Sequence, residues 1–219
     1  MTEPSAPVHI AIALFPRLTV LDAVGPYEVL QRLPEFDVTF VGHETGPVRA
    51  DNGFLGLEVD ATFADLPDPD VLVVPGGVGA RELTGDDVIL DWIRRAHRTS
   101  RFTTSVCTGS MLLAAAGLLD GLTATTHWAY MDQLADLGAK PTPDRVVEHL
   151  DDRLITAAGV SSGIDMALRL VEVMVDRTAA EAVQLLIEYD PEPPVDSGSP
   201  AKAPAHAMAR AIEYAGLRS

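Results

Sequence analysis

The chain has 219 residues, of which 47% are hydrophobic, and its 32 acidic and 16 basic residues give a formal net charge of −16. This length and composition can bury a full hydrophobic core, and no linker-like stretch divides the chain before its C-terminal region, so one domain over 1–219 is expected. The charge argues against a nucleic-acid partner, because a phosphate-binding surface needs clustered positive charge. The densest basic cluster, within 94–101, is expected to be the solvated face of one helix.

The cysteine and histidine content argues against disulfide and metal chemistry. Cys107 is the one cysteine, so the chain cannot form an internal disulfide, and the cysteine content gives no sign of an oxidising compartment. The N-terminus lacks the basic region of a signal peptide, and the longest apolar stretch, 111–119, is too short to span a bilayer. We therefore expect a cytoplasmic protein with no membrane partner. The six histidines show no ligand-like spacing, so no metal and no cofactor are expected.

The first half of the chain alternates apolar strands with helical segments. The expected elements are, in order, a strand at 8–14, a helix around 24–33 with Gly25-Pro26 at its start, a strand at 36–41, a hairpin or small extra strands at 46–60, a strand at 70–74 and a helix at 87–99.

The second half continues the alternation and ends in a Pro-rich arm. The expected elements are a strand at 102–106, a helix at 108–116 ended by Gly117, a short segment at 123–126, a helix from Trp128, a hairpin pairing 145–150 with 153–157, helices at 163–175 and 179–188, an arm without regular structure at 190–204 and a helix at 205–214. This α/β order predicts a parallel sheet with helices on both faces, with ligands at the carboxyl ends of the strands.

Cys107 lies at a junction that is typical of a nucleophile. The sequence Ser105-Val106-Cys107-Thr108-Gly109 fits the G-x-S-x-G nucleophile elbow, with cysteine as the nucleophile and Ser105 in place of the first glycine. Free N–H groups and the dipole of the following helix favour a thiolate, which predicts a lowered pKa of the thiol. The alternative is an inert core cysteine, since free cysteine is among the most buried residue types.

Asp22 is the best candidate for a proton carrier beside this thiol. It lies in the otherwise apolar segment 19–26, just after the first strand, where a carboxylate is costly without a partner or a chemical role. Helix capping is the alternative, because Thr19 and Asp22 also have capping-box spacing. The residues alone leave both possibilities open.

Backbone N–H groups are the expected donors for developing negative charge. Thr108, directly after the nucleophile, supplies one, and the turn at Gly76-Gly77 can supply another, although Pro-Gly-Gly is also an ordinary turn. Because Thr108 is not a histidine, no imidazole adjoins the thiol in sequence, which makes a protease the weakest interpretation. His127 is expected to be a hydrogen-bonded residue near a strand end rather than a direct catalyst.

Together these residues resemble the DJ-1/PfpI superfamily and, within it, the isonitrile (isocyanide) hydratases. The resemblance covers nearly the whole chain, and its motifs are Leu14-Phe15-Pro16 through Leu21-Asp22 and Gly25-Pro26, Val74-Pro75-Gly76-Gly77, Ser105 to Ser110, Ala124 to Tyr130, and the tail from Glu188-Tyr189 to Pro200. It implies a flavodoxin-like, class I glutamine amidotransferase-like fold and a homodimer.

The resemblance also implies roles for individual residues. Cys107 would be the nucleophile, Asp22 the acid/base and Thr108 a residue beside the reacting centre, and the Ala158-Gly159-Val160 backbone would lie near the pocket. One departure is that 156–159 reads Thr-Ala-Ala-Gly, with alanines where these hydratases are richer in glycine. This departure affects the expected loop shape and substrate size rather than the chemistry.

The activity implied by the resemblance is that of an isonitrile hydratase, a carbon–nitrogen lyase. The Cys107 thiolate would add to the terminal carbon of an isonitrile while Asp22 delivers a proton, giving a thioimidate. Water held by Asp22 and Thr108 would then release an N-substituted formamide.

Two other functions fit similar motifs. One is a DJ-1-like glyoxalase, deglycase or cysteine oxidation sensor. The other is a free-standing ligand-binding domain that resembles the N-terminal domain of AraC-type regulators. Those regulators carry a helix-turn-helix domain after this one, for which we expect no room before Ser219.

Overall fold

The computed structural model describes residues 6–216. Contacts within the chain define two compact units, Met1–Ile187 and Glu188–Ser219, which are described separately. The division falls two residues before the predicted arm, and residues 190–204 form no helix or strand. The single domain over 1–219 remains a prediction.

A seven-stranded sheet forms the centre of the first unit within the described residues, and its order is β10-β11-β7-β6-β1-β2-β5. Neighbouring strands run parallel except β10, which pairs antiparallel with β11 at one edge. The strands are β1 (Val8–Ala13), β2 (Phe36–Gly42), β5 (Ala61–Thr62), β6 (Val71–Val74), β7 (Phe102–Val106), β10 (Val146–His149) and β11 (Leu154–Ala157).

Two small sheets stand beside the main one. The hairpin expected within 46–60 is confirmed as β3 (Gly46–Arg49) paired antiparallel with β4 (Gly56–Val59). A second pair, which the sequence did not predict, joins β8 (Thr123–Ala124) in parallel to β9 (Lys140–Pro141). Thr126, whose hydroxyl donates to the Cys107 carbonyl, follows two residues after the end of β8.

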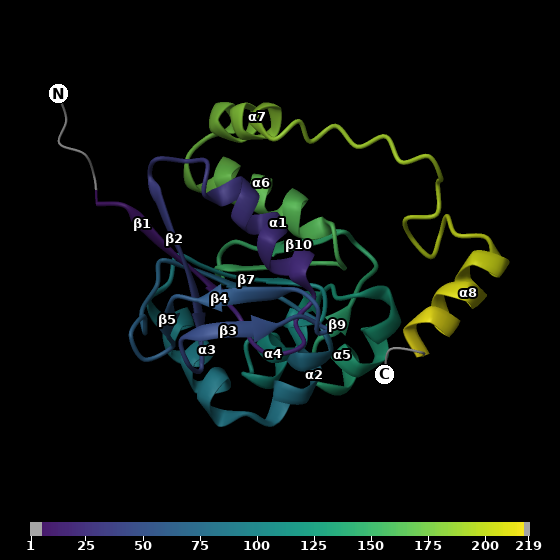
Figure 1. Cartoon of the computed structure of the whole chain (residues 1–219), viewed down its shortest axis with the longest axis horizontal. Coiled ribbons are helices and arrows are strands. Elements are labelled where there is room, and N and C mark those ends of the chain that lie inside the picture. The colour runs from purple at the N-terminus through teal and green to yellow at the C-terminus, as the bar shows by residue number, and fades with distance from the viewer. Residues whose placement is uncertain (1–5, 217–219) are drawn as a thin grey trace. The chain divides into compact units, whose positions relative to one another are not determined.

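Helices cover both faces of the main sheet (Figure 1). On one face, α1 (Val20–Leu30) packs against α6 (Ser162–Met174), and α7 (Arg177–Leu186) packs on α6. The opposite face carries α3 (Asp87–Thr99) and α4 (Gly109–Ala115), with α2 (Val78–Glu82) and α5 (Met131–Asp136) next to α4. Two 3₁₀ turns, Leu83–Gly85 and Trp128–Tyr130, adjoin α2 and α5, and α8 (Ala205–Gly216) belongs to the second unit. The predicted α/β fold with helices on both faces is confirmed.

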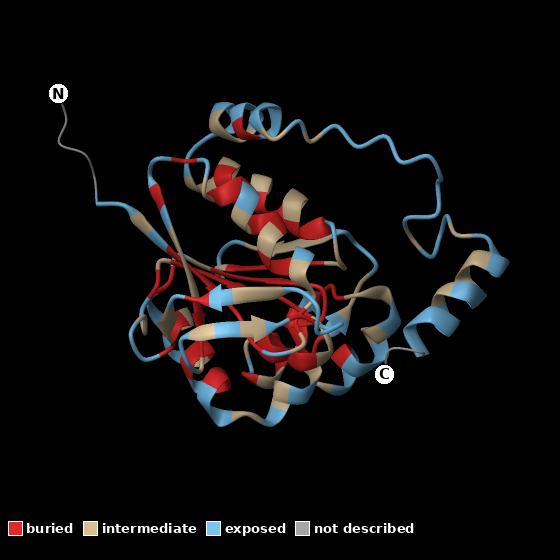
Figure 2. Cartoon of the chain, viewed as in Figure 1, coloured by how far each residue is buried: buried red, intermediate tan, exposed pale blue. Residues whose placement is uncertain are grey.

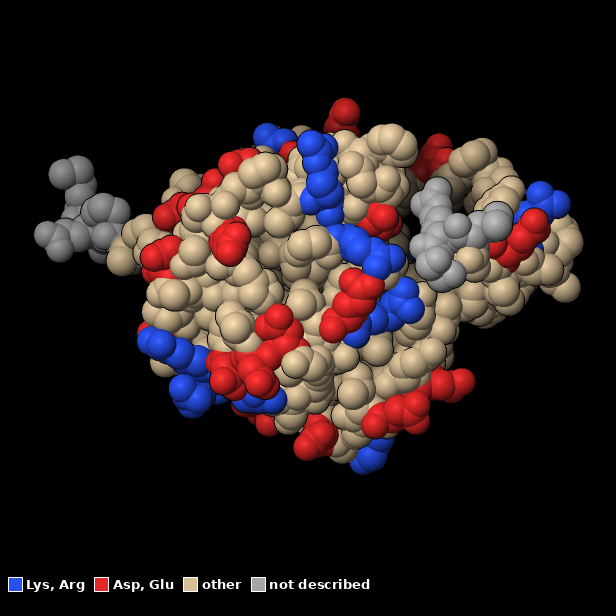
Figure 3. Space-filling view, turned by 60° about the horizontal axis from the view of Figure 1, so that its bottom comes forward, with Lys and Arg blue, Asp and Glu red and all other residues tan. Residues whose placement is uncertain are grey.

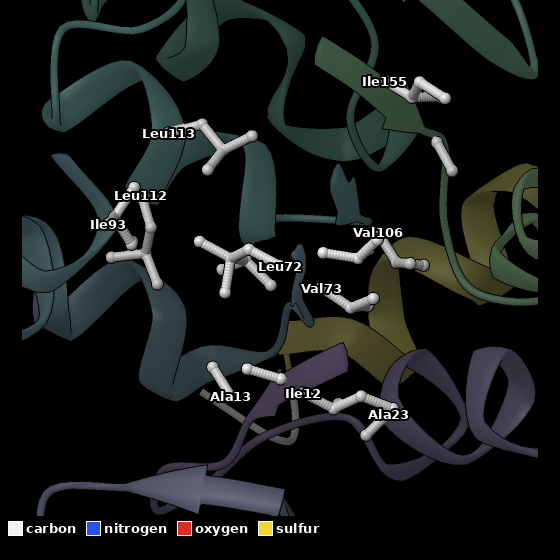
Figure 4. Packing of buried hydrophobic residues seen from close by; sticks show 14 of the residues in the cluster. Ile12, Ala13, Ala23, Leu72, Val73, Ile93, Val106, Leu112, Leu113 and Ile155 are labelled. Atoms are coloured by element: carbon white, nitrogen blue, oxygen red, sulfur yellow. The ribbon is translucent and has the colours of Figure 1, made fainter. Parts of the chain in front are cut away.

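The hydrophobic core lies along the middle strands, where the buried residues concentrate (Figure 2). Ile12, Leu72, Val73 and Val106 have no exposed surface. Leu112 of α4 lies on the side of Leu72, and Ala23 of α1 lies beside Ile12 (Figure 4). Because both faces of the parallel sheet are covered, β6 is apolar throughout, and even the polar residues of β7, Thr103 to Ser105, are buried. This packing fixes the carboxyl ends of β1, β6 and β7, where the candidate site lies.

The structure corrects the sequence prediction around 20–33. The helix begins at Val20 rather than near Val24, and Pro26 lies inside it rather than at its start. The Gly-Pro pair is an ordinary helix-start signal, but the buried Ala23, Gly25 and Val29 pack the whole segment as one helix. The earlier start places Asp22 in the first turn of α1.

Among the described residues, none of the helices is both long enough and apolar enough to cross a membrane. On the face shown in Figure 3, the basic side chains are interspersed with acidic ones.

Candidate active site

Cys107 occupies the turn between the end of β7 and the start of α4, as the sequence predicts. Its φ of 58° lies in the left-handed region, which a residue with a side chain adopts only when its surroundings hold it there. The Cys107 N–H donates to the carbonyls of Ala157 at 3.0 Å and Ala158 at 3.1 Å. Its carbonyl accepts from the hydroxyls of Thr126 at 3.0 Å and Ser110 at 3.1 Å. The backbone of the candidate nucleophile is therefore fixed on both sides.

Gly109 lets α4 begin directly against the ends of neighbouring strands. A Cβ atom at this position would lie 2.1 Å from the Val74 carbonyl oxygen and 2.8 Å from that of Pro75. No side chain fits in this space, which accounts for glycine two residues after the nucleophile. The close approach brings the Gly76-Gly77 loop, which follows Pro75, beside Thr108.

Asp22 is fully buried and points to the thiol rather than capping its own helix. Its Oδ2 accepts a hydrogen bond from the Gly76 N–H at 3.0 Å. Its Oδ1 is buried without a nitrogen or oxygen partner among residues 6–216, and the Cys107 thiol interacts with this carboxyl. Thr19 at the start of α1 makes no side-chain cap. The capping alternative for Asp22 is therefore wrong.

Burial raises the pKa of the Asp22 carboxyl to about 8, because the charged form loses its hydration. The Gly76 N–H and the Cys107 thiol lower this pKa by hydrogen bonding, and the charge of Asp51 raises it slightly further. Near neutral pH Asp22 is consequently a neutral acid that can donate a proton.

Burial also raises the pKa of the Cys107 thiol, which is 5% exposed, well above the value of an ordinary cysteine. The charge of an ionised Asp22 raises the thiol pKa further, and hydrogen bonds from Thr108 lower it. The prediction of a lowered pKa is therefore wrong, because burial outweighs the donors at the helix start. The resting pair is a neutral thiol beside a neutral carboxylic acid.

The Gly76-Gly77 loop connects Asp22 to Thr108. A Cβ on Gly76 would lie 2.5 Å from the Thr108 nitrogen and 2.9 Å from Asp22 Oδ2. The Thr108 hydroxyl accepts from the Gly77 N–H at 2.9 Å and lies 3.1 Å from the Gly77 carbonyl, to which it can donate. The loop therefore holds the two side chains that act on the thiol. The prediction that its N–H groups are donors for developing charge is wrong, because the Gly76 N–H is engaged by Asp22 and the Gly77 N–H by Thr108.

Gly159 and Val160 follow the two carbonyls that hold the Cys107 N–H. A Cβ on Gly159 would lie 2.4 Å from the Cδ2 atom of His127, so the imidazole ring packs directly on this glycine. Val160 is half-buried, and no direct contact places its side chain on the thiol. Their position after Ala158 agrees with a place at the edge of the site.

His127 is hydrogen-bonded locally, as predicted. Its Nδ1 accepts from the Ala129 N–H at 3.3 Å, which leaves the ring proton on Nε2 when the ring is neutral. Burial lowers the pKa of the imidazole, which favours this neutral form. The ring lies 5.4 Å from the ring of Trp128 and 5.7 Å from that of Tyr130, centroid to centroid.

Sequence reasoning missed Thr126, Ser110 and Ala157 as residues that fix the Cys107 backbone, and it expected Ala158 near the pocket only through the family resemblance. Thr126 and Ser110 bind the Cys107 carbonyl, and Ala157 and Ala158 bind its N–H. A signal for Thr126 was present, because a pair of threonines directly follows a short strand in the motif containing His127. The two alanine carbonyls carry no sequence signal, since any residue supplies a backbone oxygen. Within 6–216 no group of three or more His, Cys, Asp or Glu residues is placed to hold a metal ion.

A doubly covered parallel sheet with a buried cysteine on a strand-to-helix turn defines an α/β protein of the nucleophile-elbow class. More particularly, the chain belongs to the DJ-1/PfpI family, whose model matches residues 8–173.

Relatives of known name support this assignment. Over 197 residues the chain is 49% identical to the isonitrile hydratase of Pseudomonas putida, covering 90% of this chain and 85% of that protein. A solved structure of a ThiJ/PfpI family protein from Pseudomonas syringae has a TM-score of 0.91 and 39% identity, covering 98% of this chain and 88% of that one. The HTH-type transcriptional regulator CdhR of Pseudomonas aeruginosa is 30% identical over 164 residues, which cover 72% of this chain and 48% of the regulator.

Proposed function

We propose that this protein hydrates isonitriles to N-substituted formamides, with Cys107 as the nucleophile and Asp22 as the acid/base. The observation that carries the proposal is the fully buried Asp22 carboxyl, which has one oxygen on the Gly76 N–H and interacts with the Cys107 thiol. A carboxyl is costly at such a depth unless it has a partner or a chemical role. The 49% identity to an isonitrile hydratase supplies the reaction that this pair would perform.

The first step adds the thiol across the terminal carbon of the isonitrile, R–N≡C. Asp22 gives its proton to that carbon while the sulfur bonds to it, and the thiol proton passes to the carboxylate just formed. The product is a thioimidate, R–N=CH–S–Cys107, with Asp22 protonated again. Because the acid is neutral at the start, as its raised pKa allows, no unpaired charge has to be buried beforehand.

The second step adds water to the thioimidate carbon. Asp22 protonates the nitrogen and takes a proton from the attacking water, which gives R–NH–CH(OH)–S–Cys107. The hydroxyl proton then passes through Asp22 to sulfur as the C–S bond breaks. Formamide, R–NH–CHO, leaves, and the thiol and the acid are restored, so the net change is the addition of one water.

Thr108 and the Gly76-Gly77 loop hold this pair in place. The Gly76 N–H fixes one Asp22 oxygen, and the Thr108 hydroxyl binds the Gly77 backbone while also contacting the sulfur. The backbone N–H and the hydroxyl of Thr108 stabilise negative charge that develops on sulfur in both steps. No metal or other cofactor is needed in this scheme.

A binding function is the second candidate, favoured by the similarity of 164 residues to the regulator CdhR. A cysteine oxidation sensor or a glyoxalase, in contrast, would need an exposed or activated thiol. The high pKa of the Cys107 thiol disfavours spontaneous oxidation, because the thiolate is the species that oxidants attack.

The experiment is to assay the purified protein against a panel of small isonitriles and against methylglyoxal, with formamide measured directly. We expect formamide at the rate of isonitrile loss, and little turnover of methylglyoxal. Turnover of methylglyoxal alone would favour the glyoxalase, and turnover of neither would favour a binding or sensing domain.

A further inference from the structure

Arg81 is an unpaired cation close to the candidate site. It lies on α2, one helical turn beyond Gly77, and is half-buried. Its neighbour Glu82 pairs with Arg17, and no carboxylate of the described residues lies within ion-pair distance of Arg81. Most other arginines are paired with a carboxylate: Arg17, Arg32, Arg94, Arg95, Arg145, Arg169, Arg177 and Arg210.

Two routes of contact connect Arg81 to the elbow. Along the chain, α2 begins directly after Gly77, whose N–H donates to the Thr108 hydroxyl at 2.9 Å. Across space, the Arg81 guanidinium carbon lies 4.5 Å from the centroid of the Tyr130 ring, which is 5.7 Å from the ring of His127.

The second route continues from His127 to the thiol. The His127 ring packs on Gly159, and the preceding residue, Ala158, accepts the Cys107 N–H at 3.1 Å. The rings of His127 and Tyr130 thus form a series of contacts between the backbone that holds Cys107 and the Arg81 guanidinium. A substituent on the isonitrile nitrogen that extends along these rings would reach Arg81.

The chemistry of Arg81 points to an anionic group on that substituent. A guanidinium binds a carboxylate through two parallel N–H bonds, and stacking on an aromatic ring holds its plane while its N–H edges stay free. The chain as a whole carries a net charge of −16, which disfavours anions. An unpaired cation at the site is therefore the local feature that would let an anion approach.

We infer that the substrate of this site is an isonitrile that carries a carboxylate, which Arg81 binds while the terminal carbon lies at Cys107. This inference rests on the proposed hydratase function. Arg81 is a specificity residue in this account and takes no part in bond making.

The test compares an ω-isocyano alkanoate with its methyl ester as substrates of the wild type, Arg81→Gln and Arg98→Gln. Arg98 is a matched control, because it is an exposed arginine with no carboxylate partner among the described residues and lies at the end of α3, just before β7 begins. That position is at the opposite end of β7 from Cys107. Both variants remove one positive charge.

We expect the wild type to prefer the carboxylate substrate. Arg81→Gln should lower kcat/KM for it by about 10- to 100-fold, mainly through KM, and change kcat/KM for the ester by less than about twofold. Arg98→Gln should change neither. Arg81→Lys keeps the charge without the planar fork and should give an intermediate loss, which also covers the case that Arg81→Gln does not fold.

The outcomes separate this inference from the proposed function. Hydration of both substrates at equal efficiency, with no effect of either Arg81 variant, would overturn the inference and leave the hydratase standing. Failure of the wild type to hydrate either substrate would overturn both. A preference for the carboxylate that disappears equally in Arg98→Gln would show a general charge effect and would also overturn it.

Discussion

The pairing of Asp22 with Cys107 determines what this site can do. Each group alone would be an unfavourable buried polar residue, and together they form a neutral acid beside a neutral thiol. The carboxyl is held on one oxygen by the Gly76 N–H at 3.0 Å, which leaves the other for proton transfer. In the proposed mechanism a proton therefore moves between substrate and sulfur without charge separation in the core.

Replacing Asp22 with asparagine tests the acid/base role. The change keeps the shape and the acceptor for the Gly76 N–H but removes the titrating group, so isonitrile hydration should fall by roughly 10²- to 10⁴-fold. Asp22→Glu should recover part of the loss, because it restores a carboxyl at a displaced position. Near-normal turnover by folded Asp22→Asn protein would remove Asp22 from the mechanism.

The pH dependence of the rate follows from the raised pKa of Asp22, about 8. The acid form donates the first proton, so kcat/KM should be nearly constant below pH 7 and fall as the pH rises through about 8. A site that needed a preformed thiolate would show the opposite slope. A rate that rises between pH 7 and 9 would therefore contradict the neutral-pair mechanism.

The free energy of unfolding should also depend on the protonation of Asp22, which gives a test that is independent of activity. Between about pH 4 and pH 8 the unfolded chain has lost the Asp22 proton while the folded protein keeps it, so this residue makes the free energy of unfolding fall as the pH rises, by at most about 1.4 kcal/mol per pH unit. Asp22→Asn lacks this contribution. As the pH rises through that range, the free energy of unfolding of the variant should increase relative to that of the wild type, as measured by urea unfolding at several pH values. A difference between the two free energies that does not change with pH would argue against the raised pKa.

At the scale of elements, the sequence predicts most of the framework. The apolar runs at β1 and β6, the β-branched run at β7 and the helix at 87–99 are recognisable because buried parallel strands and an amphipathic helix leave clear patterns. The nucleophile elbow at 105–109 is predictable because the close approach of the helix start to the neighbouring strand ends requires small residues there. In contrast, α2 at Val78–Glu82 contains Gly79, directly follows Gly77 and gives no helix pattern.

The pKa values were the part of the site that local sequence could not predict. Residues 105–109 indicate donors at a helix start, which lower the pKa of a thiol, but burial depends on what covers the turn. Here the cover comes from α1, from the loop after β6 and from the end of β11, which are distant in the sequence. The same distant contacts exclude helix capping by Asp22.

Gly76→Ala tests the tight joint between the loop and the elbow. The added methyl would lie 2.5 Å from the Thr108 nitrogen and 2.9 Å from Asp22 Oδ2, so we expect a loss of about 1–3 kcal/mol in stability and a large loss of turnover. Gly85→Ala is a matched control, because nothing lies within 4 Å of its added methyl. Equal effects of the two variants on activity would contradict the importance of this joint.

At the scale of the whole molecule, we propose that two copies of the chain form a homodimer. Near the end of α7, shortly before the Pro-rich arm at 190–204, the side chains of Leu185 and Leu186 are 78% and 68% exposed. Apolar side chains that are this exposed favour a partner that covers them. Leu185→Ser together with Leu186→Ser should shift sedimentation at micromolar concentration from dimer to monomer. A wild-type monomer under these conditions would refute the proposed assembly.

The central claim is that Cys107 carries the substrate covalently during hydration, and the rate of formamide formation by Cys107→Ala tests it most directly. The alanine fits the space of the thiol, so the protein should remain folded, as circular dichroism would verify. We predict no formamide above the uncatalysed rate, because the hydroxyls and carboxyls that remain cannot form the thioimidate. Formamide production by folded Cys107→Ala at the wild-type rate would contradict the account.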